Sequence, residues 1–253
     1  MAYKLDKELE FLQYMDDKSL DSLVETLIRD KDGELRLTES ITSNDLYKKF
    51  SPQHSNYWEL IAGELQSFGG NSFVNIFRGG GVQYKEILCE VCDKMGVNYN
   101  KNSNVINIEQ NLFMKILEDS MKDMSTEELK SIVEELNLKT QTYTSQAVMA
   151  AMQVAIKQSG FFVYKMAAII VNAVLKALFG RGLTFVGTGI MMRSISAFAG
   201  PIGWAITAAW TAFDVAGPAF RVTIPAVIQV AFLRQQYINK NIIEEELLNE
   251  SNK

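Results

Sequence analysis

The sequence contains few of the residues on which enzyme active sites and metal centres usually depend. Histidine occurs once, as His54, and cysteine occurs twice, as Cys89 and Cys92. A histidine-based triad would have to use His54 itself, and a zinc site of several histidines cannot be built within one chain. His54 follows Pro52 in a polar stretch, which predicts a surface loop. We therefore expect no catalytic residue, no metal and no cofactor.

The two cysteines form a single "CEVC" pair inside an apparent helix, "YKEILCEVCDKMG". Structural zinc needs four ligands, and a redox cysteine is favoured at a helix N-terminus, whereas Cys89 falls in mid-helix. The pair is therefore interpreted as small buried hydrophobes. Two cysteines give no disulfide framework, and the charged N-terminus "MAYKLDKELEF" has no apolar core of a secretory signal. Both observations indicate a cytoplasmic setting.

Glycines cluster once beside a cationic residue, in "FRGGGVQYKEIL", where Arg78 precedes Gly79, Gly80 and Gly81. Backbone amides at the start of a helix can hold an anion. No Gly-Lys-Ser/Thr motif follows, and no strand precedes the glycines. The motif is therefore either an anion site for a phosphate or lipid headgroup, or a tight turn between helices, and the turn is the preferred interpretation.

Charge is divided unevenly along the chain. Residues 1–140 contain 16 Lys and Arg against 25 Asp and Glu, whereas residues 141–235 contain seven basic residues and one acid, Asp214. The last 18 residues contain two basic and four acidic residues. A weakly basic, apolar segment thus follows an acidic one, as expected if the apolar segment meets either anionic lipid or the chain's own acidic half.

The acidic half is predicted to form short amphipathic helices. "SLDSLVETLIRDKDG" places Leu20, Leu23, Val24, Leu27 and Ile28 at helical spacing. Further helices are expected in "SNDLYKKF", with Ser43 as N-cap, in "NYWELIAGELQSFGG", and in "STEELKSIVEELN", where Ser125 and Glu128 have capping-box spacing. Alternating strand patterns are scarce. The class is therefore all-α.

We expect a multi-helix bundle with an acidic N-terminal helical part and an apolar C-terminal helical hairpin region. Pro52 and a change of composition near residue 140 suggest three parts. These are a small N-terminal helical module (1–51), an acidic helical domain (52–140), and an apolar, membrane-interacting region with a polar tail (141–253).

The stretch "FFVYKMAAIIVNAVLKALF", residues 161–179, is long enough to cross a bilayer. Its Lys165, Asn172 and Lys176 share one helix face, and Gln158 extends this polar seam. Eleven large apolar residues favour insertion by about 3 to 7 kcal/mol in sum, while each centred lysine opposes it by about 2.5 to 3.5 kcal/mol. A buried helix, an interfacial helix and a helix packed in lipid all fit this balance.

The next segment favours membrane contact. Residues 194–213 carry no charge, and the region 141–235 has few polar residues with which to cover its own outer surface. The acidic half would have to enclose it almost completely if it were soluble. The candidate membrane-interacting residues are Phe161, Phe162, Lys165, Asn172, Lys176, Trp204 and Trp210.

Asp214 is the single acid in this apolar region, and it is flanked by Arg193 and Arg221. An unpaired carboxylate in lipid or in a core is costly, which predicts a partner for Asp214, with Arg221 preferred.

Two stretches carry a resemblance to a known family. Residues 56–88, "NYWELIAGELQSFGGNSFVNIFRGGGVQYKEIL", and residues 217–236, "GPAFRVTIPAVIQVAFLRQQ", resemble the characteristic blocks of the YaaW-like family of bacterial proteins. Residues 5–39, "LDKELEFLQYMDDKSLDSLVETLIRDKDGELRLTE", also resemble the short N-terminal module of that family. The family is in turn described as distantly similar to ubiquinol-cytochrome c chaperones. The resemblance implies a helical fold and offers no reaction or catalytic residue.

The sequence leads to two functional hypotheses. In the first, the protein is non-enzymatic and attaches to the inner membrane through its apolar C-terminal helices, with a membrane-perturbing role in stress or defence. In the second, it is a soluble helical chaperone or assembly factor that binds an apolar client helix. The expected partner is accordingly membrane lipid or a client helix, and a homo-oligomer is compatible with both. Nucleic acid is not expected, because no basic patch is interleaved with aromatic residues.

Overall fold

The computed structural model describes residues 3–30, 32–37, 39–70, 81–180 and 219–244. Apart from one isolated bridge between Arg29 and Leu35, these residues form helices and connections, which confirms the all-α prediction. The helices, in chain order, are η1 (Glu10–Tyr14), α1 (Asp17–Ile28), α2 (Asp45–Phe50), η2 (His54–Tyr57), α3 (Trp58–Gly70), α4 (Tyr84–Lys94), α5 (Val105–Ser120), α6 (Thr126–Glu135), α7 (Ser145–Gln158), α8 (Gly160–Phe179) and α10 (Phe220–Ile238).

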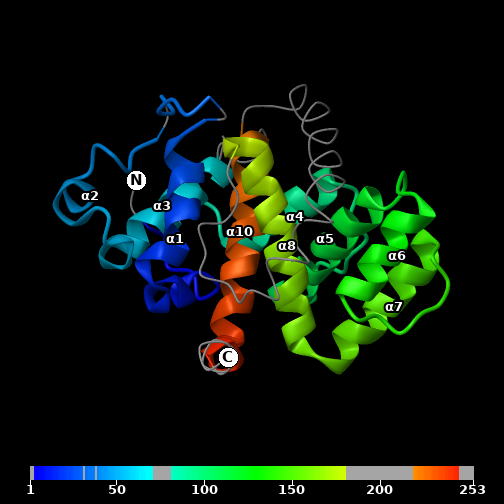
Figure 1. Cartoon of the computed structure of the whole chain (residues 1–253). Coiled ribbons are helices and arrows are strands. Elements are labelled where there is room, and N and C mark those ends of the chain that lie inside the picture. Colours follow the sequence, from blue (N-terminus) through cyan, green and yellow to red (C-terminus); the bar gives the residue numbers. More distant parts are fainter. Residues whose placement is uncertain (1–2, 31, 38, 71–80, 181–218, 245–253) are drawn as a thin grey trace.

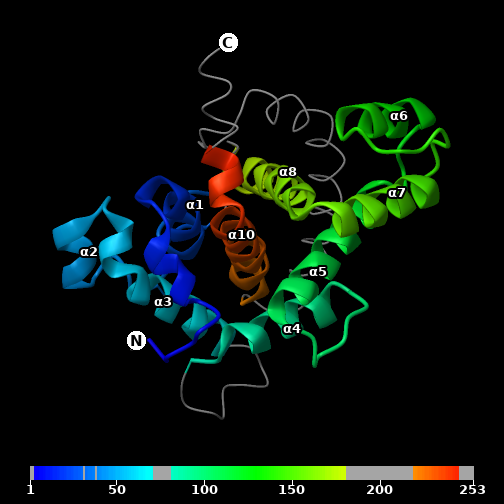
Figure 2. The same ribbon diagram turned by 90° about the horizontal axis from the view of Figure 1, so that it is seen from below.

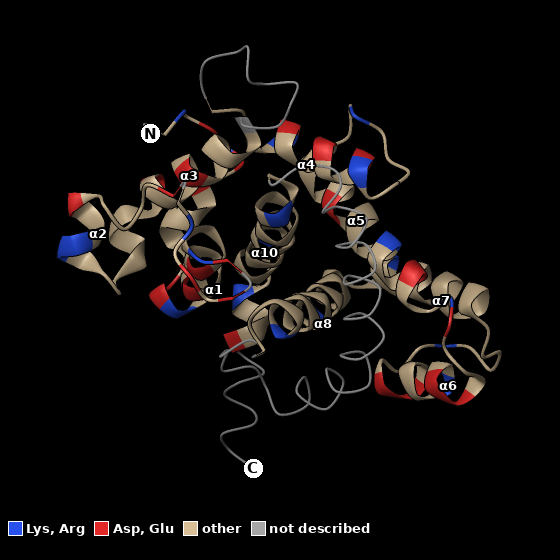
Figure 3. Cartoon of the chain, turned by 90° about the horizontal axis from the view of Figure 1, so that it is seen from above, with Lys and Arg blue, Asp and Glu red and all other residues tan. Residues whose placement is uncertain are grey.

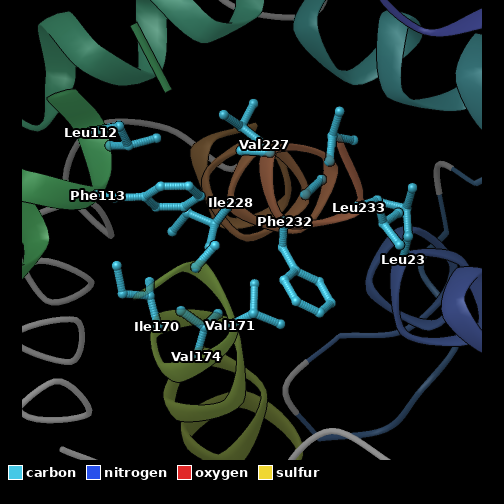
Figure 4. Packing of buried hydrophobic residues seen from close by; sticks show 14 of the residues in the cluster. Leu23, Leu112, Phe113, Ile170, Val171, Val174, Val227, Ile228, Phe232 and Leu233 are labelled. Carbon is cyan, nitrogen blue, oxygen red and sulfur yellow. The ribbon is translucent and has the colours of Figure 1, made fainter. Parts of the chain in front are cut away.

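Helix α10 lies at the centre of the molecule (Figures 1 and 2). It runs antiparallel to α8, its most extensive neighbour, and contacts α1, α3, α4 and α5 on its other sides. Figure 4 shows the centre of the resulting core, in which Phe113 from α5 and Val171 from α8 approach Ile228 and Phe232 of α10. A helix that is apolar on nearly every face is stable only when other helices surround it, which is the position of α10.

Most of the helix features predicted for the acidic half are present in the structure. Helix α1 buries the five predicted apolar residues, and Ser125 with Glu128 forms the predicted capping box at the start of α6. The predicted N-cap of α2 was wrong by one residue. Asn44 is the N-cap, and its side chain accepts a hydrogen bond from the backbone N–H of Leu46.

The polar seam of α8 is confirmed within that helix. Lys165 and Asn172 are half-buried and Lys176 is exposed, while the intervening apolar residues are buried. Gln158 does not belong to the seam, because α7 ends there and Ser159, in an extended conformation, separates the two helices.

Within the described residues, helices of the acidic half cover much of α10, which the composition argued against. Helices α1, α3, α4 and α5 contact α10, and Figure 3 shows them arranged around it. Buried residues from all three predicted parts of the chain join one hydrophobic cluster. The division at residues 51 and 140 itself stays a prediction.

Candidate functional site

An open groove runs along α7. Two adjoining pockets, of about 400 Å³ and about 350 Å³, share Asn137, Ala155 and Gln158 as lining residues. The first lies between α7 and the connection that follows α6, and the second continues to the start of α8. The described residues lining this α7 groove are Glu135 to Thr140, Ala147, Ala150, Ala151, Val154, Ala155, Gln158, Ser159, Phe161, Phe162, Lys165 and Ile169.

The backbone at both ends of α7 shapes the groove. After α6, Asn137 adopts a positive φ of 52°, and the N–H of Leu138 donates to the carbonyl of Val133 at 2.8 Å. This is the hydrogen bond of a Schellman motif, in which asparagine replaces the usual glycine. It turns the chain sharply beside α7. At the other end, the single extended residue Ser159 sets α8 at an angle to α7.

Helix α7 is less enclosed than the other helices of its length. Only Val148 and Met152 are buried, while Val154 is 51% exposed and Ala150 is also exposed. Small and apolar side chains therefore form one wall of the groove in contact with solvent. Such a surface suits an apolar partner, because a neighbouring helix can approach closely over alanines.

A second feature is a group of charged and polar side chains in and beside the core, here called the Arg234 cluster and made of Asp6, Glu8, Tyr84, Glu109 and Arg234. The Nε of Arg234 donates to both carboxylate oxygens of Glu109 at 3.1 Å, and Tyr84 Oη donates to Glu109 Oε1 at 2.6 Å. Arg234 Nη2 donates to the carbonyl of Glu8 at 2.8 Å. The backbone N–H of Tyr84 donates to Asp6 Oδ2 at 2.6 Å. The cluster thus joins α10, α5, α4 and the N-terminal segment.

Aromatic rings complete the enclosure of Arg234. The centre of its guanidinium lies 4.6 Å from the ring centroid of Phe11 and 5.4 Å from that of Tyr84. Glu109 is 0% exposed, and burial raises the pKa of its carboxyl, while Arg234 and the Tyr84 hydroxyl act in the opposite direction. For Arg234, burial is the largest influence and acts to lower the pKa, but Glu109, Tyr84 and Glu8 together outweigh it and the pKa is raised. We assign an ion pair, since the guanidinium keeps its proton.

Sequence reasoning missed the Arg234 cluster, although a signal was present. Glu109 lies within the apolar stripe of α5, between Ile108 and Leu112, and Arg234 interrupts an apolar run. The argument that a charge in an apolar segment needs a partner was applied to Asp214. It applies equally to Arg234 and Glu109, and would have predicted a pair.

The interpretation of His54 as a surface loop residue was wrong. His54 is 4% exposed and lies in η2, where its Nε2 is 2.6 Å from Asp21 Oδ1 and its Nδ1 contacts the Tyr57 hydroxyl. The polar residues around it in sequence concealed a partner from α1. Asp21, His54 and Glu25 line a pocket of about 250 Å³, yet no group of three acidic, histidine or cysteine side chains in the described ranges is placed to hold a metal ion.

The cysteine pair behaves largely as expected. Cys92 is buried, and Cys89 is half-buried. Burial raises the pKa of the Cys92 thiol to about 12, which is the opposite of what a thiolate nucleophile or metal ligand needs.

Many of the predicted site residues lie outside the described ranges, namely Trp204, Trp210, Asp214, Arg193, Arg78, Gly79 and Gly80. Gly81 is described. A Cβ atom there would lie 2.9 Å from the Cβ of Gln66, so glycine permits a close approach between the start of α4 and α3. Arg221 lies in the first turn of α10 and is exposed. Phe162 is buried and Phe161 is half-buried.

Within the described residues, one helix has the length and composition to cross a membrane. It is α8, and 67% of its most apolar window is buried inside the protein. Core helices of soluble proteins have the same property, so membrane insertion draws little support from α8.

Comparisons with known proteins place these features in a family. The model of the ubiquinol-cytochrome C chaperone family matches residues 53–229, and a separate model, a domain of unknown function, matches residues 3–37. A UPF0174 protein of Helicobacter pylori J99 is 49% identical over 92% of this chain and 93% of its own length. The UPF0174 protein YaaW of Escherichia coli K12 is 30% identical over 92% of this chain and 95% of its own length.

Another UPF0174 protein of H. pylori J99 is shorter. It is 39% identical and matches along 98% of its own length, but it covers 79% of this chain. No solved structure matches the chain.

Proposed function

The chain belongs to the ubiquinol-cytochrome C chaperone family together with the UPF0174 proteins, and we propose that it is a non-catalytic helical chaperone that binds an apolar helix of a client protein. The proposal places it in the cytoplasm as a soluble protein. It takes up the second of the two hypotheses from the sequence, and the family match over residues 53–229 supports it.

The observation that carries the proposal is the α7 groove. Its wall consists of alanines with the exposed Val154, and its length follows α7, so a client helix would lie along α7. Helix-in-groove recognition uses apolar residues three and four positions apart on the bound helix, which fit between small residues of the receptor. Lys165 at the α8 end of the groove would favour an acidic residue at one end of the client helix.

Binding of a fluorescein-labelled, 18-residue Leu- and Ala-rich amphipathic peptide to the purified full chain tests the proposal. We expect saturable binding, measured by fluorescence anisotropy, in buffer without detergent. Val154→Glu would place a charge in the groove and should weaken binding by about tenfold or more, since a buried charge without a partner is costly. The matched control is Gln153→Glu, which adds the same charge at an exposed position of α7 that does not line the groove. Its affinity should remain that of the wild type.

The membrane hypothesis predicts a different behaviour of the expressed and of the purified chain. The expressed chain would stay in the membrane pellet after a carbonate wash, and the purified chain would float with vesicles of anionic phospholipid. Flotation with vesicles together with no peptide binding, or equal loss of binding in Val154→Glu and Gln153→Glu, would overturn the proposed function.

A further inference from the structure

Helix α1 packs on α10 in a regular antiparallel pairing. Gln236 Nε2 donates to the Ser19 hydroxyl at 2.9 Å, and Gln229 Nε2 donates to the Thr26 hydroxyl at 2.6 Å. Leu23 and Leu233 lie together between these two polar pairs (Figure 4). The first polar pair is separated from the second by seven residues on each helix, which is two helical turns. The contacts therefore form one continuous stripe.

The polar atoms of this stripe are incompletely satisfied. Gln229 is 1% exposed, yet its Oε1 has no hydrogen-bond partner, and neither does Oε1 of Gln236. Permanent cores pair nearly all of their buried polar atoms, because an unpaired one forfeits its hydration. Interfaces that form and separate are more polar and tolerate imperfect pairing. The α1-facing stripe of α10 has the character of the second kind.

The family comparisons separate the two helices. Helix α1 lies inside the 3–37 match, whereas Gln229 is the last residue of the 53–229 match. The segment that carries α1 is thus matched as a unit of its own, and it packs on α10, which lies within the chaperone-family match up to Gln229 and beyond it at Leu233 and Gln236.

The N-terminal segment is anchored independently of α1. Asp6 and Glu8 are held by Tyr84 and Arg234, and the Gln66 amide pairs with both backbone groups of Lys4, at 2.9 Å and 2.8 Å. These contacts precede η1 and would persist if α1 moved away. Departure of α1 therefore does not require the N-terminus to detach from the protein.

We propose that the stripe of α10 formed by Gln229, Leu233 and Gln236 is a second helix-binding surface, which α1 occupies until a client helix replaces it. The proposal rests on the proposed function, because it concerns the same class of partner. The client helix would carry α1's own pattern, with a hydroxyl residue, a leucine four positions later and a second hydroxyl residue seven positions after the first. It would lie antiparallel to α10, and its hydroxyls would accept hydrogen bonds from the two glutamine amides.

The probe for this surface is a labelled peptide of residues 16–29, added to the full chain. In the wild type, the attached α1 competes at high effective concentration, so binding should be weak. Replacing both hydroxyls of the attached helix, Ser19→Ala with Thr26→Val, weakens its docking while the peptide keeps its own hydroxyls. We expect this variant to bind the peptide about tenfold more tightly. Lys18→Ala, an exposed change on α1 away from α10, is the matched control and should not alter affinity.

A reversible lock gives the converse test. A disulfide between Leu23→Cys and Leu233→Cys, verified by mobility on a non-reducing gel, should abolish peptide binding, and reduction should restore it. The inference is overturned if the locked chain binds as well as the reduced one, or if the hydroxyl-free variant, with a wild-type circular dichroism spectrum, binds no better than Lys18→Ala. The 18-residue probe of the α7 groove distinguishes this failure from failure of the proposed function. If that probe still binds in a Val154-dependent way, only the α10 surface is disproved.

Discussion

Removing one member of the ion pair between Glu109 and Arg234 should have effects that depend on which member is removed. Glu109→Gln keeps the shape of the side chain and leaves an arginine that cannot lose its proton in the core. Arg234 would retain the Glu8 carbonyl, two aromatic rings and the half-buried Glu8 carboxylate at 3.8 Å, but no fully buried carboxylate. Loss of one member of a buried pair typically lowers the free energy of unfolding by about 3 to 5 kcal/mol. For a chain of this length the melting temperature should fall by about 6 to 20 °C.

Arg234→Met should show a pH dependence that Glu109→Gln lacks. Without its cation, the buried Glu109 has a raised pKa and becomes neutral by binding a proton. The folded variant then binds a proton more tightly than the unfolded chain. The stability that the variant gains from protonating Glu109 is fully present below the carboxyl's unfolded pKa of about 4.3. It is lost as the pH rises through the folded pKa of Glu109. The destabilisation relative to wild type should therefore be smallest near pH 4 and largest near neutral pH.

Urea unfolding followed by circular dichroism at 222 nm, at several pH values, measures both effects. The double variant completes a thermodynamic cycle and should lose less stability than the sum of the single variants, because no charge remains unpaired. Additive losses, or a loss below about 1 kcal/mol for Glu109→Gln, would refute the assignment of a buried ion pair.

Three further predictions concern local packing and chemistry. Gly69→Ala should lower the free energy of unfolding by about 1 to 3 kcal/mol, since the added Cβ would lie 2.5 Å from Cγ1 of Ile87, and an unchanged urea midpoint would contradict this close approach. Ser125→Ala should cost about 1 kcal/mol and speed amide exchange in the first turn of α6, while equal protection in both proteins would show that the capping box is dispensable. Cys92 should resist alkylation at pH 8.5 until the chain unfolds, because its thiol pKa is raised to about 12, whereas Cys89 should react first. The same raised pKa makes the contribution of Cys92 to stability present below the unfolded value of 9.0 and lost as the pH rises towards about 12, which alkaline unfolding can measure.

The elements that were predicted well are those fixed by neighbours in sequence. The apolar stripe of α1, the capping box of α6 and the polar seam of α8 each depend on residues a few positions apart. His54 failed because its environment is set by Asp21, which lies 33 residues away on another helix. Helix periodicity contains no information about such contacts.

The covering of the apolar helices could not be predicted for a related reason. The region 141–235 has too few polar residues to cover its own apolar surface. This count does not reveal that helices from residues 1–140 cover part of that surface instead. In the structure, α1, α3, α4 and α5 contribute buried apolar residues to the cluster and contact α10, around which Figure 3 shows them arranged. An apolar helix as long as α10, of 19 residues, can be enclosed in this way by several helices that are each shorter than α10 itself.

The polar residues of α10 also explain how an apolar helix acquires a defined orientation. A helix that is apolar on every side can rotate about its axis at little cost, because one hydrophobic face replaces another. Arg234 fixes one face towards α5 and the N-terminal segment, and Gln229 fixes another towards α1. Rotation would break these bonds and leave buried polar atoms without partners. The ion pair is complete and the amides are not, so the Arg234 face is suited to permanent packing and the glutamine face to exchange. This difference between two faces of one helix is the physical basis of the proposed exchange, in which the incoming helix would have to replace the core contacts of Leu20, Leu23 and Leu27.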